Sequence, residues 1–273
     1  MQRNTMRRTF FLIIGVVLLT SSFLLSCVSI NSHMKYVNRD SDKTPDDAFV
    51  YVEVQHKTSP GICLASEKYE ECVEIIKSLP PIIKKGSGSG MLVWAKHKPI
   101  YLTAAHVCVE NVPNIFDQDG IKFTIDQKVK IRVLDSSGVY ANTSIIALDE
   151  DADLCALRVN KLRTAPVKIS HRPPKVGDVV YAISAPYGIH SPSMTLVFSG
   201  HYSGHDKKWN YYTIPTRPGS SGSAVLNENY RVVGMLNAAF LHIEHIGLGA
   251  SHQEIVLFVN KVSKILEENT EKN

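Results

Sequence analysis

Three short segments carry side chains that together could activate an alcohol for attack on a carbonyl group. Ser221 lies in a glycine-flanked run that predicts a tight turn, His106 follows a predicted strand, and Asp153 precedes an apolar run. A serine hydroxyl is inert unless a base accepts its proton. An imidazole accepts a proton near neutral pH, and a carboxylate holds that ring in the reactive tautomer. We therefore predict that Ser221, His106 and Asp153 converge as nucleophile, base and orienting carboxylate.

Neighbouring groups complete this predicted site. Asp149 and Asp151 are alternatives to Asp153, but only Asp153 is followed directly by the apolar run, which places it between solvent and core. The oxyanion that forms during attack needs backbone N–H donors, and the amides of Gly219 and Ser221 stand where such a pair forms. Because an imidazolium cannot accept a proton, we expect the reaction to slow as the pH falls.

The N-terminal residues are typical of an export signal over residues 1–26. Three arginines within the first eight residues precede an apolar run over residues 10–19. The segment Leu24-Leu25-Ser26-Cys27 resembles the lipobox of bacterial lipoproteins, which predicts lipidation of Cys27. An uncleaved anchor over residues 10–30 stays open, since about 20 apolar residues span a bilayer. Both interpretations predict an exported, membrane-anchored protein on the periplasmic or extracellular side.

Composition indicates a globular domain after a short linker. The 273 residues are 44 % hydrophobic and 21 % charged, which is ordinary for a folded protein. The formal net charge is +4, and the three leader arginines account for all but +1 of it. This small excess gives no electrostatic reason to expect nucleic acid as a partner. We predict a polar linker over residues 27–45 and one domain over residues 46–273.

The cysteines predict disulfides, because exported proteins fold in an oxidising compartment. With Cys27 assigned to a lipid, four of the five cysteines remain. Cys63 and Cys72 are close in sequence, and we expect them to form a local bridge. Cys108 and Cys155 lie two residues after His106 and Asp153, so convergence of that pair would bring them together. A second bridge and two buried thiols both remain open for them.

Short apolar segments separated by Gly, Pro, Asn and Asp predict an all-β domain. The composition of residues 86–90, Gly-Ser-Gly-Ser-Gly, favours a flexible linker, whereas its position before an apolar strand favours a strand. We expect a short helical insertion within 62–79 and a C-terminal helix over 259–269. The expected strands cover residues 49–54, 91–94, 99–103, 129–134, 144–148, 154–159, 179–184, 195–202, 211–214, 224–226, 232–236 and 254–256.

The motifs resemble those of trypsin-like (chymotrypsin-fold) serine peptidases, most closely the bacterial HtrA/DegP-like and glutamyl-endopeptidase-like domains. Thr103-Ala104-Ala105-His106-Val107 is similar to the histidine motif, and Gly219-Ser220-Ser221-Gly222-Ser223 to the serine motif. Asp153-Leu154-Cys155-Ala156-Leu157 is similar to the aspartate strand, with Cys155 as an extra residue. Further similarity to HtrA/DegP lies in residues 88–91, 176–178, 185–188 and 199–200.

The order of the three residues along the chain supports this resemblance. Serine hydrolases of unrelated folds share one geometry but not one chain order, and His, Asp, Ser is the chymotrypsin order. That order argues against an α/β-hydrolase esterase, as does Ser223 at a position where the esterase motif needs glycine. A binding protein of the same fold with a misaligned triad remains the rival interpretation.

The resemblance implies two antiparallel six-stranded β-barrels, split near residues 160–175, and a C-terminal helix. It places the three residues in the cleft between the barrels. It also implies hydrolysis of peptide bonds in polypeptide substrates through an acyl-enzyme, without a metal or a cofactor. Because the sequence ends at Asn273, we expect no PDZ domain after the peptidase domain.

The resemblance also locates the pocket for the substrate side chain, for which we expect Thr216, Asn237, Ala238 and Ala239 as binding residues. No acidic residue occurs among these positions, which disfavours cleavage after Lys or Arg. We expect small or medium uncharged side chains to be accepted.

Histidines near the expected pocket suggest two further roles. A glutamate preference would need a cation, and His201, His205 or His242 would have to supply it. The pairs His201/His205 and His242/His245 have the spacing of metal ligands only on a helix. Both pairs fall in strand or loop sequence, so we expect no metal site.

Overall fold

The computed structural model describes residues 45–271 with gaps at 65–67, 111, 162–165, 193 and 241–242. The predicted export signal over residues 1–26, the linker up to residue 44 and the lipidation site Cys27 lie outside the described residues. Within the described ranges, no helix combines the length and apolarity that crossing a bilayer requires.

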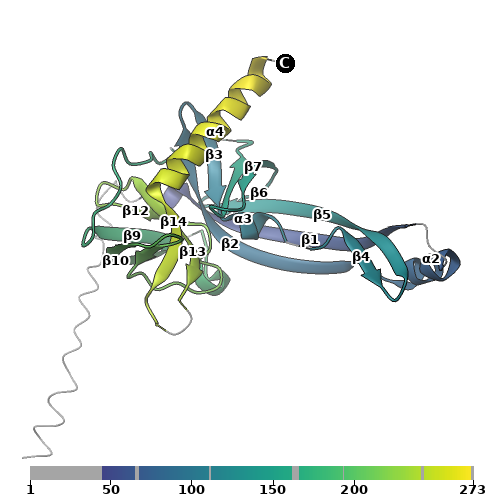
Figure 1. Ribbon diagram of the computed structural model, residues 1–273. Helices are drawn as coiled ribbons and strands as arrows, with labels where there is room; N and C mark the ends of the chain where they lie inside the picture. Colours follow the sequence, from purple (N-terminus) through teal and green to yellow (C-terminus); the bar gives the residue numbers. More distant parts are fainter. Residues whose placement is uncertain are drawn as a thin grey trace, which may run out of the picture. The chain divides into compact units, whose positions relative to one another are not determined.

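The first half of the described chain forms one eight-stranded sheet (Figure 1). A short 3₁₀ turn, η1 (Pro45–Ala48), leads into it. The strands lie in the order β4-β5-β1-β2-β3-β8-β7, and β6 pairs with β5. The elements are β1 (Phe49–Cys63), α2 (Tyr69–Ser78), β2 (Ile82–Ala95), β3 (Lys98–Thr103), α3 (Ala105–Cys108), β4 (Ile115–Gln118), β5 (Ile121–Asp135), β6 (Tyr140–Thr143), β7 (Ile145–Asp149) and β8 (Leu154–Arg158).

The second half forms a closed barrel in the order β10-β11-β14-β13-β12-β9. Its elements are β9 (Val179–Ser184), η2 (Pro186–Gly188), β10 (Leu196–His205), β11 (Asn210–Tyr212), β12 (Ser223–Leu226), β13 (Val232–Ala239) and β14 (Gly247–Ser251). The helix α4 (His252–Glu271) follows the last strand. The all-β fold with a C-terminal helix is thus confirmed.

The N-terminal sheet differs from the closed six-stranded barrel that the resemblance implied. It is an open sheet, in which the long strands β2 and β5 pair with opposite edges of β1 far beyond the region that covers the core. β1 pairs with β2 from Phe49 to Thr58, and with β5 from Val50 to Cys63. The outer parts of these strands, with α2 and β4, form an extension that we call the arm (residues 55–85 and 112–130).

A disulfide fixes the end of the arm. Cys63, the last residue of β1, is bonded to Cys72, the one fully buried residue described in α2, which confirms the expected local bridge. The predicted helical insertion is also present, but it begins only at Tyr69, because β1 continues as a strand through Cys63. The bridge therefore ties α2 to the sheet that it covers.

The predicted strand at residues 254–256 is wrong, because these residues form the first turns of α4. The amide of Ser251 donates to the Glu254 carboxylate at 2.6 Å, and the amide of Glu254 donates to the Ser251 hydroxyl at 3.1 Å. This reciprocal pair is a capping box, which satisfies amides that a helix start leaves free. Ile255, Phe258 and Val262 are then buried, each contributing about 1.5–3 kcal/mol of apolar burial.

Strand β14 was not predicted, because its sequence Gly-Leu-Gly-Ala-Ser has low β propensity. The structure explains its glycines by the close approach of β13. A Cβ atom on Gly249 would lie 1.6 Å from the carbonyl oxygen of Met235. Strands β4 and β6 were also missed. Both are short edge strands with mostly exposed side chains, which leave little apolar pattern in the sequence.

A histidine near the N-terminal sheet makes the stability of the fold depend on pH. The ring of His190 lies 5.2 Å from that of Phe49 and 5.9 Å from that of Tyr51, centroid to centroid. Its Nε2 atom is buried without a hydrogen-bond partner among the described residues. Burial lowers the pKa of His190, so the unfolded chain binds this proton more readily than the folded protein does.

We expect the free energy of unfolding to fall as the pH drops through the ordinary histidine range, about 6.5. In His190→Phe, which keeps an apolar ring and removes the titrating group, the loss between pH 7.5 and 5.5 should be smaller. Urea unfolding at both pH values measures it. His171→Phe, at an exposed position, is the control and should lose as much as the wild type. Equal losses in all three proteins would contradict the assignment.

Candidate active site

The ring of His106 and the carboxylate of Asp153 are in direct contact. His106 lies on the single turn of α3, and its Nδ1 is 2.7 Å from Oδ2 of Asp153. The other carboxylate oxygen accepts a hydrogen bond from the His106 amide at 2.9 Å. An ionised carboxylate at this position keeps the proton on Nδ1 and leaves Nε2 as the proton acceptor. The two predicted partners are therefore brought together, with the ring in the orientation that a base needs.

A second disulfide joins the elements that carry these two side chains. Cys108 ends α3, Cys155 lies in β8, and the two are bonded across 47 residues of chain. Of the two possibilities that the sequence left open, a second bridge and two buried thiols, the structure has the bridge. In the chain-entropy account, closing a loop of this size stabilises the fold by about 4 kcal/mol. The bond also limits how far His106 and Asp153 can separate.

Ser221 lies in a turn whose backbone requires glycine on both sides. Gly219 has φ +94° and Gly222 has φ +88°, values that other residues rarely adopt. A Cβ on Gly222 would lie 2.3 Å from Oγ1 of Thr103 and 2.9 Å from the amide nitrogen of Ala104. The serine turn is therefore packed against the chain that leads directly into α3. This contact places the serine turn beside the residues that precede His106 in the chain.

Ser89, a residue of β2, holds the serine turn against the N-terminal sheet. Its amide donates to the carbonyl of Ser221 at 2.8 Å, and its hydroxyl donates to the carbonyl of Gly219 at 2.8 Å. The same hydroxyl accepts the amide of Ala185 at 2.9 Å, and its carbonyl accepts the Thr103 hydroxyl at 2.7 Å. The strand at residues 86–90, favoured by their position, is confirmed, but the sequence alone indicated no role for Ser89.

Asn237 links Ser221 to the backbone of Asp153, a connection that the sequence did not indicate. Its side-chain amide donates to the carbonyl of Asp153 at 3.1 Å, and its own carbonyl accepts the Ser221 hydroxyl at 3.3 Å. The described hydrogen bonds do not include one between Ser221 and the His106 ring. Catalytic hydrogen bonds are often long or misaligned without substrate and tighten when it binds. Asn237 is thus bonded both to the Ser221 hydroxyl and to the backbone of Asp153.

The amides of Gly219 and Ser221 are available as oxyanion donors. Neither amide hydrogen-bonds to another described residue. The carbonyls of the same two peptide groups are occupied: that of Pro218 by the amide of Tyr187 at 2.6 Å, and that of Ser220 by the amide of Ser223 at 3.0 Å. These bonds fix the orientation of each peptide group, which is what preorganised stabilisation of an oxyanion requires.

The expected specificity residues lie at the end of β13 and before the serine turn. Thr216 and Asn237 are buried, and Ala238 and Ala239 are half-buried. The expectations from the sequence did not include Arg217, a cation beside Thr216. Its guanidinium donates to the carbonyl of Thr216 at 3.3 Å and pairs with Glu244 at 3.4 Å.

Of the histidines considered for a glutamate pocket or a metal site, the three described ones, His201, His205 and His245, are exposed. His201 and His205 are exposed on β10, and His242 lies outside the described residues. Within the described ranges, no group of three or more His, Cys, Asp or Glu residues is placed to hold a metal ion.

Comparisons with known proteins agree with this geometry. A family model of the trypsin-like peptidase domain matches residues 88–235, more than half of the chain. A serine endoprotease from Yersinia pestis has a similar structure, with a TM-score of 0.55 and 20 % sequence identity. The match covers 80 % of this chain and 64 % of that one, so this chain corresponds to less than two thirds of it. No curated protein matches the sequence significantly.

Removing the Ser89 hydroxyl should weaken the junction between the two sheets. Ser89→Ala leaves the Ala185 amide and the Gly219 carbonyl without their partner, and we expect a loss of about 2 kcal/mol or more in the free energy of unfolding. Denaturant titration measures it. Ser87→Ala, two residues along the same strand and half-buried, is the matched control, with an expected change within about 0.5 kcal/mol. Equal losses would show that the hydroxyl of Ser89 is not a structural link.

Proposed function

Since the chain belongs to the trypsin-like peptidase family, we propose that it is an exported, membrane-tethered serine endopeptidase with Ser221, His106 and Asp153 as its catalytic triad. The observation that carries the proposal is the double contact of the Asp153 carboxylate with the amide and the ring of His106. A carboxylate bound in this way leaves one ring nitrogen free to act as a base next to the serine turn.

In the proposed mechanism, Nε2 of His106 accepts the proton of the Ser221 hydroxyl as Oγ attacks the carbonyl carbon of the peptide. The carbonyl oxygen becomes negative and accepts hydrogen bonds from the amides of Gly219 and Ser221. The imidazolium, stabilised by Asp153, then gives its proton to the leaving amine, and the C–N bond breaks. Water, deprotonated by the same ring, attacks the acyl-enzyme ester and releases the second product.

One rotation is needed before the first step. The Ser221 hydroxyl donates to the carbonyl of Asn237, so its Oγ–H must turn toward the His106 ring when substrate binds. This hydrogen bond is the observation that favours the rival, a binding protein on the same fold in which the triad stays unaligned. Activity, rather than geometry alone, therefore separates the two.

A fluorophosphonate probe tests the nucleophile directly, because it reacts only with an activated serine. We expect labelling of the wild type, no labelling of Ser221→Ala, and loss of peptide cleavage by about a thousandfold or more in His106→Ala and Asp153→Asn. His201→Ala, which changes an exposed histidine on β10, is the control and should label at the wild-type rate. A folded wild type that neither labels nor cleaves any peptide library would favour the binding protein.

The membrane tether is proposed from the leader sequence alone. The basic start, the apolar run and Leu24-Leu25-Ser26-Cys27 support a lipoprotein with Cys27 as its first mature residue. In cells fed radiolabelled palmitate, we expect the wild type to carry label and Cys27→Ser to carry none and to retain residues 1–26. A membrane-bound wild type without palmitate and with its leader intact would instead support the uncleaved anchor.

For the cleaved side chain we propose a preference for small or medium uncharged residues. The proposal is supported by the residue types at Thr216, Ala238 and Ala239. It is also supported by Arg217, whose positive charge beside Thr216 disfavours a Lys or Arg side chain. A cleavage profile on a peptide library measures this preference. A profile dominated by Arg or Lys would contradict it.

A further inference from the structure

One edge of β2 has no neighbouring strand over the half that belongs to the arm. β1 pairs with β2 along its inner edge from Met91 to Ile82, whereas β3 covers the outer edge only from Met91 to Ala95. Between Ile82 and Gly88 the outer edge therefore has no partner among the described strands. Figure 1 shows this part of β2 at the margin of the arm.

The unpaired edge begins next to Ser89, which is bonded to Ser221, the proposed nucleophile. At Ser89 the outward-facing amide and carbonyl bind the Ser221 carbonyl and the Thr103 hydroxyl. Backbone groups of a strand alternate in direction with period two. The amides and carbonyls of Ser87, Lys85 and Ile83 therefore face outward too, and none of them hydrogen-bonds to another described residue.

We propose that this edge binds the leaving-group side of a polypeptide substrate as an added antiparallel strand. The inference rests on the proposed function, because the scissile bond must lie at Ser221. A chain that leaves Ser221 toward Ser87, Lys85 and Ile83 runs opposite to β2, which is the antiparallel direction. The three residues span about 13 Å, and we call this part of the edge the substrate track. Filling the substrate track needs roughly six substrate residues after the scissile bond. Main-chain hydrogen bonds supply the affinity in this mode of recognition.

On one face of the track the charges are basic. Lys85, Gln55 and Lys130 are in register across β2, β1 and β5, and they line a hollow of about 560 Å³. Arg132 in the same hollow is paired with Glu53, while Lys85 and Lys130 form no ion pair with another described residue. A substrate side chain that points to this face beside Lys85 is therefore expected to be acidic.

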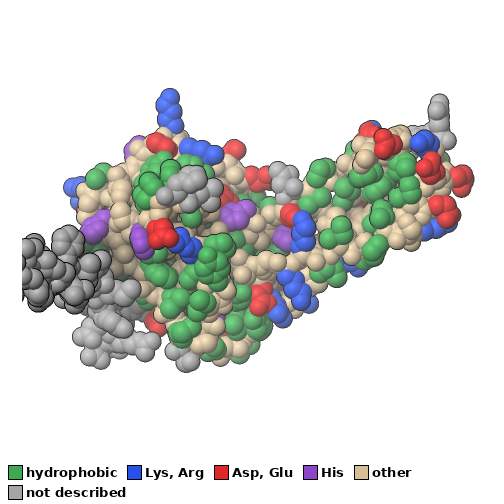
Figure 2. Space-filling model, turned by 90° about the horizontal axis from the view of Figure 1, so that it is seen from below, with side chains coloured by type: hydrophobic (Ala, Val, Ile, Leu, Met, Phe, Trp, Pro, Cys, Tyr) green, Lys and Arg blue, Asp and Glu red, His purple; other side chains and the backbone are tan. Residues whose placement is uncertain are grey.

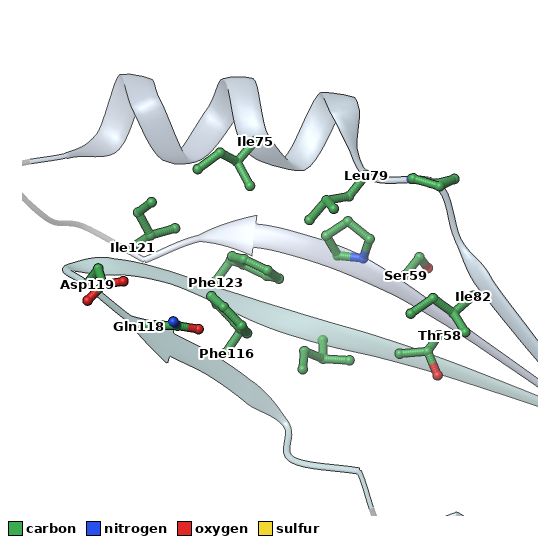
Figure 3. Close-up of a pocket in the computed structure, with 13 residues that line it drawn as sticks. Thr58, Ser59, Ile75, Leu79, Ile82, Phe116, Gln118, Asp119, Ile121 and Phe123 are labelled. Carbon is green, nitrogen blue, oxygen red and sulfur yellow. The ribbon is translucent and has the colours of Figure 1, made fainter.

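On the other face the track ends at an apolar pocket of about 440 Å³ near the tip of the arm. Figure 3 shows Ile75 of α2 and Leu79, the residue after α2, on one side and Phe116 and Phe123 on the other. The two phenyl rings stack at 4.8 Å, and Ile82 of β2 lines the same pocket. Because Ile82 also lies at the far end of the unpaired edge, a substrate side chain beside it can enter this pocket.

Exposed apolar residues on the arm extend this surface. Figure 2 shows hydrophobic side chains along the arm on the face seen from below. So many exposed apolar side chains on one extension are uncommon on a surface that only meets water. The exposed large hydrophobic residues of the arm are Ile62, Tyr69, Leu79, Ile82, Ile83, Ile115, Phe116 and Val129.

Two alternative roles of the unpaired β2 edge lead to different experimental results. Lysines on an edge strand commonly prevent unwanted pairing between sheets, in which case substrate length has no effect on cleavage. A second copy of the chain could also pair with the edge, in which case the edge controls oligomeric state and not cleavage. Peptide length and oligomeric state therefore distinguish both roles from binding of the substrate's leaving-group side.

The main test uses the wild-type protein and peptides that are identical up to the scissile bond. One series carries two residues after that bond, and the other carries eight. In the longer series, an acidic residue is placed to lie beside Lys85 and an apolar residue to lie beside Ile82. We expect kcat/KM to be about tenfold higher or more for the long peptides, a gain of about 1.4 kcal/mol. Methylating the backbone amides of the added residues, which removes their donors, should abolish most of that gain.

Variants at Lys85 separate the backbone from the charge. Lys85→Pro removes an outward N–H, which an edge strand tolerates, and should reduce the gain for the long peptide about threefold or more. Lys85→Ala keeps the N–H and should lose only the preference for the acidic residue. Ile82→Asp should remove the preference for the apolar residue. Cleavage of the two-residue series should stay unchanged in all three variants, which also reports that they are folded.

Failure of the inference is distinguishable from failure of the proposed function. If the probe labels Ser221 and short and long peptides are cleaved equally, the enzyme stands and the substrate track is wrong. If Lys85→Pro changes the oligomeric state measured by light scattering but not the effect of peptide length, the occupant is a second copy. If nothing is labelled or cleaved, the proposed function fails first.

Discussion

The arrangement of this molecule depends on the hydrogen bonds of one buried serine in a glycine-rich strand. Ser89 offers its amide, carbonyl and hydroxyl to Ser221, Thr103, Gly219 and Ala185. These partners come from the N-terminal sheet, from the serine turn and from the loop after β9. Because an unpaired buried polar group is costly, all four bonds must form together. Their joint formation sets the position of the serine turn relative to α3.

Covalent bonds and glycines reinforce the same junction. The Cys108–Cys155 bridge ties the element that carries His106 to the strand that follows Asp153. Gly222 allows the serine turn to approach Thr103 and Ala104 more closely than any other residue would permit. Preorganisation of this kind matters for catalysis, since donors and base that are already in place need not reorganise during the reaction. The Ser221 hydroxyl, bonded to the Asn237 carbonyl, still has to turn toward His106.

The arm follows from the length of three strands, and it changes what surrounds the junction. In a closed barrel, β2 would have neighbours along both edges. Here β3 ends beside Met91, and the outer half of β2 continues with one edge unpaired. Edges of this kind are normally covered or shortened. That this one starts beside Ser221, with a basic hollow on one face and an apolar pocket at its end, is a property of the tertiary structure alone.

The sequence by itself determined the all-β class, the local bridge between Cys63 and Cys72, and the pairing of His106 with Asp153. These are local signals, carried by apolar periodicity, turn residues and short motifs. The start of α4 was also readable, because Ser251 and Glu254 have the spacing of a capping box, although the apolar residues after them suggested a strand. Only the tertiary structure decided that β14 forms, that Cys108 bonds Cys155, that Asn237 bridges Ser221 and Asp153, and that the first sheet stays open. Each of these depends on which backbones come within hydrogen-bonding or bonding distance, and residues far apart in the chain carry no local pattern that encodes such approaches.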